Sequence, residues 1–139
     1  MTLAGVWLID QGIKELFLSG FGLYGGCISL ELHMNRGVAF SLFASLGEWL
    51  KWVQVLLIGG MLLYFHREGS LKSHPLVTGA LAGGALGNLY DRFAHGAVVD
   101  YIYWHCGFDF AVFNFADVII DFSVVSLLWL LWREGDEKR

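Results

Sequence analysis

The sequence predicts an all-α polytopic membrane protein, with four transmembrane helices and a small extracytoplasmic β element after the first of them. Of its 139 residues, 56% are hydrophobic, 16% are aromatic and one is proline. The mean hydropathy is +0.57, which is higher than soluble domains show. Apolar stretches long enough to cross a bilayer also alternate with short polar connections. We therefore expect a single membrane-embedded domain over residues 1–139.

Charge and cysteine content argue against two classes of function. The net charge is -4 and the nine lysine and arginine residues are scattered along the chain, so a nucleic-acid-binding surface is not expected. Cys27 and Cys106 have no metal-ligand spacing and no histidine pair nearby, which argues against a zinc site. The sequence leaves open whether the two cysteines form a disulfide.

The first span, approximately residues 1–18, is short. The stretch TLAGVWLI covers only eight residues before Asp10, whereas a full span needs about 20. It has neither a basic region before it nor a small-residue cleavage motif, so we do not interpret it as a signal peptide. Asp10 and Lys14 stand at i and i+4. They form either an ion pair on the helix surface or part of a site at the membrane edge.

Residues 19–43 follow a different pattern from the spans. Within CISLELHM, hydrophobic and polar side chains alternate with period two, which is typical of a β-strand. We expect this strand to lie at the outer surface of the bilayer and to lead into a polar turn at Asn35, Arg36 and Gly37. Asn35 is either a simple turn residue or a member of a functional site.

The second span, residues 49–65, is flanked by aromatic side chains. Trp49 and Trp52 lie at one end and Tyr64 at the other, where interfacial aromatics are expected. Gln54 is the only polar residue in the middle of this span.

The third and fourth spans are residues 76–92 and 114–132. Basic residues concentrate in the connection before the third span and in the tail after the fourth, and the positive-inside rule places both in the cytoplasm. The segments 19–48 and 93–112 then lie outside. The basic residues assigned to the cytoplasmic side are Arg67, Lys72, Arg133, Lys138 and Arg139.

The third span combines a glycine stripe with a polar end. Its glycines recur every four residues, so they share one helix face and allow a neighbouring helix to approach closely. Beyond them, Asn88, Asp91 and Arg92 crowd one sector, Asp91 is placed to form a salt bridge with Arg92, and Gly96 ends the helix. The glycines of the stripe are Gly79, Gly83 and Gly87.

Acidic residues gather near the outer ends of the third and fourth spans. Asp100 lies in the apolar segment VVDYI, on a loop that returns to the membrane, where a carboxylate needs a partner. Asn114, Asp117 and Asp121 share one face of the fourth span. If Asp100 and Asp117 converge at a semi-dry membrane edge, they share one proton and activate a water, as aspartic proteases do. Asp91 and Asp121 are the competing candidates.

Four short motifs occur in order along the chain. They are NRGVAFS at 35–41, GNLYDR at 87–92, GAVVDY at 96–101 and FNFAD at 113–117. Together they resemble the bacterial lipoprotein signal peptidase family, also called signal peptidase II. Asp10 and Lys14 match that family's DQxxK pattern. Tyr101 stands where the family usually has phenylalanine, and this difference adds a hydroxyl beside Asp100.

The resemblance implies an intramembrane aspartic endopeptidase of the bacterial cytoplasmic (inner) membrane, with its active site near the outer face. Such an enzyme removes signal peptides from diacylglyceryl-modified prolipoproteins and contacts membrane lipid. It implies Asp100 and Asp117 as the catalytic pair, expects no metal and no cofactor, and expects inhibition by globomycin-type depsipeptides. Substrate contacts are implied for Asn35, Asn88, Arg92, Asn114, Asp10 and Lys14.

A second class of function would use the same acids. In a small proton- or ion-coupled membrane protein, Asp100, Asp117 and Asp121 would form a relay, with Asn88 and Arg92 as a gate. That function predicts polar side chains along the whole fourth span. After Asp121, however, the span is apolar apart from two serines.

Overall fold

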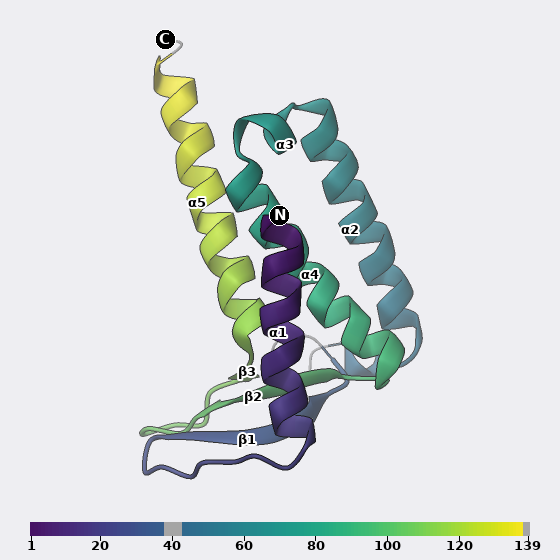
Figure 1. The fold of residues 1–139 in the computed structure, drawn as a ribbon, viewed down its shortest axis with the longest axis vertical. Helices are drawn as coiled ribbons and strands as arrows, with labels where there is room; N and C mark the ends of the chain where they lie inside the picture. The colour runs from purple at the N-terminus through teal and green to yellow at the C-terminus, as the bar shows by residue number, and fades with distance from the viewer. Residues whose placement is uncertain (38–42, 138–139) are drawn as a thin grey trace.

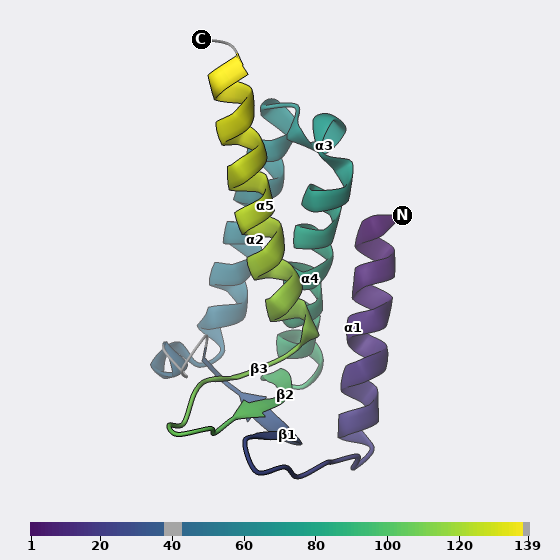
Figure 2. The same ribbon diagram turned by 90° about the vertical axis from the view of Figure 1, so that its left-hand side faces the viewer.

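The computed structural model describes residues 1–37 and 43–137, which form a helical bundle standing on a small sheet (Figure 1). The long helices are α1 (Thr2–Leu18), α2 (Trp49–Arg67), α4 (Pro75–Ala94) and α5 (Phe115–Glu137). The strands are β1 (Ile28–Asn35), β2 (Val98–Trp104) and β3 (Val112–Phe113), and the short segments are η2 (Ala44–Leu46) and α3 (Ser70–Ser73). The sheet covers one end of the bundle, and the C-terminal end of α5 lies at the other (Figures 1 and 2).

The four predicted spans correspond to the four long helices. α2 and α5 continue beyond their predicted ends, to Arg67 and Glu137, and both are long and apolar enough to cross a membrane. Only 17% of the apolar stretch of each is buried, so these are not the core helices of a soluble protein, whose apolar residues face inward. α1 has 17 residues, fewer than the roughly 20 of a full span. α4 is rich in glycine and alanine because the other helices surround it.

The glycine stripe lets helices pack closely against α4, as predicted. A Cβ atom on Gly83 would lie 2.7 Å from a backbone oxygen of α1, and one on Gly87 would overlap the carboxylate of Asp10. Gly84 faces α5 instead, where a Cβ would lie 3.0 Å from a backbone oxygen. Small residues at these positions therefore bring α1 and α5 into backbone contact with α4.

The sheet is antiparallel, in the order β1-β2-β3. The alternating segment CISLELHM forms β1, so the predicted strand is confirmed. Asn35 pairs with Val98 and His33 with Asp100. The expectation of a loop around Asp100 is therefore wrong: Asp100 lies in β2, because the β-branched and aromatic residues of VVDYIYW satisfy their backbone groups against β1. The segments 19–48 and 93–112 thus share one sheet.

A disulfide joins Cys27 and Cys106. Cys27 directly precedes β1 and Cys106 follows β2, and the backbone N–H of His105 donates to the Cys27 carbonyl at 2.9 Å. The bond closes the end of the β1–β2 ladder that is opposite to Asn35. It decides the question that the sequence left open.

Candidate active site

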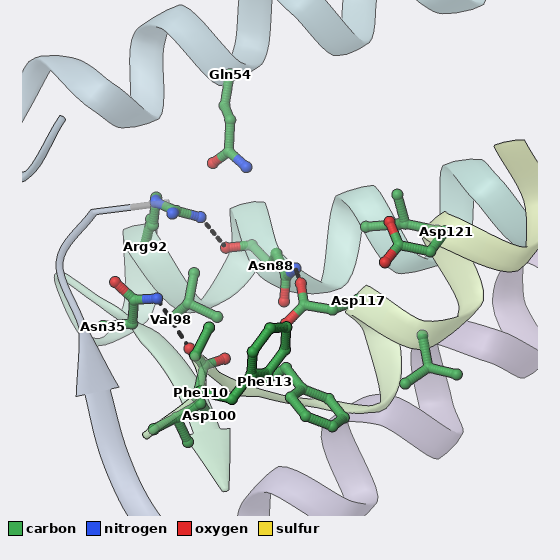
Figure 3. A pocket seen from close by; sticks show the side chains of 14 residues that line it. Asn35, Gln54, Asn88, Arg92, Val98, Asp100, Phe110, Phe113, Asp117 and Asp121 are labelled. Carbon is green, nitrogen blue, oxygen red and sulfur yellow. Dashed lines mark hydrogen bonds between the residues drawn. The ribbon is translucent and has the colours of Figure 1, made fainter. Parts of the chain in front are cut away.

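A pocket of about 620 Å³ lies between α2, α4, α5 and the sheet (Figure 3). Its walls combine apolar side chains with polar groups from five different elements, β1, β2, α2, α4 and α5. The apolar side chains include Phe110, Phe113, Val98, Val118 and Ile120. The polar residues are Asn35, Gln54, Asn88, Arg92, Asp100, Asp117 and Asp121.

Asn114 brings Asp100 and Asp117 together. Its Nδ2 donates to Oδ1 of Asp100 at 2.8 Å, and its backbone N–H donates to Oδ2 of Asp117 at 3.1 Å. In return, the backbone N–H of Asp117 donates to Oδ1 of Asn114 at 2.9 Å. This reciprocal pattern is a capping box, so Asn114 caps α5 and lies just before the helix instead of on its face. The helix cap itself therefore places Asp117 beside Asp100.

The second oxygen of Asp100 is held by Asn35. The Asn35 Nδ2 donates to Oδ2 of Asp100 at 2.9 Å, while its Oδ1 accepts the backbone N–H of Gly37 at 2.9 Å. Asn35 is therefore both a turn residue and part of the site. Burial raises the pKa of Asp100 to about 7; hydrogen bonds from Asn35 and Asn114 oppose this effect, and the charge of Asp117 adds to it. Asp100 consequently gains or loses its proton near neutral pH.

Asn88 and Arg92 extend the network along α4. The Asn88 Nδ2 donates to Oδ1 of Asp117 at 2.8 Å, and its Oδ1 accepts from Asn114 at 3.0 Å. Arg92 donates from Nη2 to the carbonyl oxygen of Gly37 and from Nη1 to that of Asn88 at 3.5 Å. Arg92 thereby ties the end of β1 to α4, beside the two acids.

Behind Asn88 lies a buried group that we call the Lys14 cluster: Asp10, Gln11, Lys14 and Asp91. The Lys14 Nζ is 2.7 Å from Oδ2 of Asp10 and 2.7 Å from Oδ2 of Asp91. The three charged side chains are at most 1% exposed. Of the two alternatives for Asp10 and Lys14, the exposed surface pair is excluded: the two side chains do form an ion pair, but α4 covers this face of α1.

The predicted salt bridge between Asp91 and Arg92 is also wrong. Consecutive residues of a helix point in different directions, so Asp91 faces α1 while Arg92 faces the pocket. Asp91 pairs with Lys14 and also accepts the backbone N–H of Val99 at 3.1 Å. It holds the start of β2 against α4.

Of the eight predicted site residues, five line the pocket, Asn114 is buried against the two acids, and two lie behind Asn88. Lys14 reaches the site only through its hydrogen bond to Oδ1 of Asn88, at 3.0 Å. Asp10 accepts the backbone N–H of Ala116 at 3.2 Å, which anchors the first turn of α5. Within the motif at 35–41, residues 38–41 lie outside the described part of the chain. The five residues that line the pocket are Asn35, Asn88, Arg92, Asp100 and Asp117.

A family model described as Signal peptidase (SPase) II matches residues 2–133. The chain belongs to the signal peptidase II family. Its relatives include a lipoprotein signal peptidase of Sulfurovum sp. (strain NBC37-1), 59% identical, with 92% of this chain and 88% of the relative covered. Another, from Sulfurimonas denitrificans, is 53% identical and covers 96% of this chain and 86% of the relative. The predicted resemblance is thereby confirmed.

The fold matches that of a solved bacterial membrane enzyme. That structure, obtained by the in meso method at 2.3 Å resolution, superposes with a TM-score of 0.81 at 24% identity. The match covers 99% of this chain and 89% of the other. It supports the same arrangement of helices and sheet for this signal peptidase II family member.

Two residues of this family member have roles at the site that its sequence did not indicate. The Tyr101 hydroxyl accepts the backbone N–H of Phe115 at 3.0 Å, and its ring stacks on Phe17 with centroids 4.3 Å apart. Tyr101 therefore helps to hold the start of α5. Gln54 reaches the pocket from α2. Its position as the lone polar residue in mid-span was the signal that could have marked it.

Proposed function

We propose that this chain cleaves signal peptides from lipoprotein precursors by aspartic catalysis, with Asp100 and Asp117 as the acid pair. The observation that carries this proposal is the shared Asn114, which binds both carboxylates at one pocket. Within the described residues, neither carboxylate forms a direct salt bridge. Relatives named lipoprotein signal peptidase support the substrate class.

The chemistry needs only the pair and a water molecule. Because the pKa of Asp100 is about 7, the pair retains one proton at neutral pH. The ionised member takes a proton from water, whose oxygen bonds to the scissile carbonyl carbon. The protonated member polarises the carbonyl oxygen and then helps to protonate the leaving amine as the C–N bond breaks.

Of the other site residues, some bind the substrate and some hold the two acids and their neighbours in position. Asn35, Asn88 and Arg92 line the pocket, so we assign them to binding the substrate. Asn114 is fully buried and orients the two acids. The Lys14 cluster lies behind Asn88, so we assign Asp10 and Lys14 to positioning the site instead of touching the substrate.

We further propose that residues 1–139 form one domain in the bacterial inner membrane, that all four long helices span it, and that the sheet faces outward. Exposed apolar side chains on α2 and α5 support the contact with lipid. The disulfide supports an oxidising compartment at the sheet end. Arg67 and Arg133 lie at the other end of the bundle (Figure 1), as the positive-inside rule requires. The substrate's acyl chains would then lie in lipid beside the pocket.

A proton or ion relay has less support. It would need polar groups along α5 beyond Asp121, but the exposed side chains between Phe122 and Trp132 are apolar. These include Phe122, Val125, Leu128 and Trp132.

Cleavage of a defined peptide tests the proposed function. The purified protein in detergent is incubated with a lipoprotein signal peptide that carries a diacylglyceryl cysteine, and with the same peptide bearing unmodified cysteine. Mass spectrometry of the products should show a cut directly before the lipidated cysteine, and globomycin should block it. If the lipidated peptide remains intact, or if the Asp117→Asn variant cleaves it equally well, the proposal is wrong.

A further inference from the structure

Gln54 stands on the wall of the pocket that faces the acids. It belongs to α2, whereas the acids lie on β2 and α5. Its amide extends from α2 across the pocket toward Arg92 and Asn88 (Figure 3). The neighbouring residues Leu56 and Leu57 are 76% and 67% exposed and face away from the protein. Gln54 is thus the inward-facing polar group of a helix whose other side is apolar.

The amide oxygen of Gln54 has no hydrogen-bond partner in the part of the chain that the structure describes. Its Oε1 is buried and accepts no hydrogen bond from the described residues. A buried acceptor without a donor destabilises a protein, and the bilayer interior supplies no donor. An unpaired acceptor that faces a substrate pocket is therefore suited to a donor on the substrate.

The chemistry of the proposed substrate limits what that donor is. A diacylglyceryl group carries ester and thioether atoms, which accept hydrogen bonds and donate none. The signal peptide, in contrast, carries a main-chain N–H at each non-proline residue. In a helix these groups are bonded internally, but the segment at the scissile bond must be unwound for the acids to reach its carbonyl. Its freed N–H groups then need acceptors inside the pocket.

We propose that Gln54 is a substrate-binding residue that accepts a hydrogen bond from a main-chain N–H of the unwound signal-peptide segment. This inference rests on the proposed function. Gln54 thereby fixes the register of the peptide from the α2 side, while the acids act from the side of β2 and α5. A single hydrogen bond of this kind is worth about 3- to 10-fold in kcat/KM.

Substitution of Gln54 gives the first test. Gln54→Leu and Gln54→Met keep the bulk of the side chain and remove the acceptor. Both should raise KM for the lipidated peptide about 3- to 10-fold and leave kcat nearly unchanged, because the bond forms in ground and transition states alike. Leu56→Met, on the exposed side of the same helix, is the control and should match the wild type. Thermal unfolding in detergent confirms that each variant is folded.

A peptide series gives the decisive test. Amides of the signal peptide near the cut, other than the scissile one, are replaced by esters one at a time, which removes one N–H each. At one position the ester should lower kcat/KM about 3- to 10-fold for the wild type and have no further effect on Gln54→Leu. At the other positions an ester should change kcat/KM by the same factor in the wild type and in Gln54→Leu.

The outcomes separate the two proposals. If the wild type cleaves the peptide and Gln54→Leu has the same KM, Gln54 does not bind the main chain. The same conclusion follows if every ester lowers kcat/KM by the same factor in both enzymes. If the wild type cleaves nothing, the proposed function is wrong and this inference falls with it.

Discussion

The chain buries two groups of carboxylates that differ in what faces them. In the Lys14 cluster, the carboxylates of Asp10 and Asp91 each lie 2.7 Å from the Lys14 ammonium group. None of these three side chains lines the pocket. Asp100 and Asp117, in contrast, accept hydrogen bonds from amide groups and both line the pocket. The residue type is the same in both places, but the partners are different.

The different partners suit the two groups to the different roles that we propose, support for the Lys14 cluster and catalysis for Asp100 and Asp117. The three N–H donors of Lys14 are all used, by Asp10, Asp91 and Asn88, so the cation holds both carboxylates in place. Amides orient a carboxylate without neutralising it, which leaves a proton free to move between the two acids of the pair. Four experiments test this contrast.

Neutralising either member of the pair should have the largest effect. Asp100→Asn and Asp117→Asn keep the shape of the side chain but cannot exchange a proton, so kcat/KM for the lipidated peptide should fall by about 10⁴-fold. The melting temperature in detergent should stay near that of the wild type. Asp91→Asn is the control: it should lower stability and leave much of the activity per folded molecule. Near-normal turnover by either variant of the pair would overturn the assignment.

Removing the cation of the Lys14 cluster should mainly destabilise the fold. Lys14→Met leaves two buried carboxylates facing each other, and breaking a buried pair in this way costs about 3 to 5 kcal/mol of unfolding free energy. The measurement is thermal or denaturant unfolding in detergent. Lys51→Met is the matched control, because Lys51 pairs with the exposed Glu48 and such pairs contribute about 0 to 1 kcal/mol. If Lys14→Met and Lys51→Met had equal unfolding free energies, the Lys14 cluster would not stabilise the fold more than an exposed ion pair does.

Breaking the disulfide should destabilise the sheet at the end opposite to Asn35. The double variant Cys27→Ser, Cys106→Ser opens a link between residues 79 apart, and loss of such a link typically costs about 2 to 4 kcal/mol. Since the other end of the β1–β2 ladder holds Asn35, kcat at a temperature where the variant is folded should be unchanged. A fall in kcat comparable with that of Asp117→Asn would show that the disulfide also shapes the site.

The pH profile should show the smallest change. Burial raises the pKa of Asp100 to about 7, and the hydrogen bond from Asn35 opposes that rise, so activity should decline as the pH rises through about 7. Asn35→Ala removes a donor that favours the ionised form, and the basic limb should therefore move to higher pH by less than about one unit. His33→Gln, on the same strand but bonded to Glu31, should leave the limb in place. Movement to lower pH would contradict the role of Asn35.

Much of the fold could be predicted because its signals are local. Apolar length predicted α2 and α5, alternation with period two predicted β1, and glycines spaced by four predicted the close packing on α4. The motifs likewise identified the family and the residues that meet at the pocket. Each of these signals depends on neighbours within a few residues along the chain.

The tertiary structure decided which partner each polar group has. Asp91 is adjacent to Arg92 in sequence yet pairs with Lys14, because helical geometry turns consecutive side chains apart and α1 packs on that face. Asp100 became a strand residue only because β1 lies beside it. Gln54 faces the acids because the bundle sets α2 across the pocket. Sequence by itself determined the long helices, the first strand and the family, whereas β2, burial and pairing depend on elements that are distant in sequence and meet only in the fold.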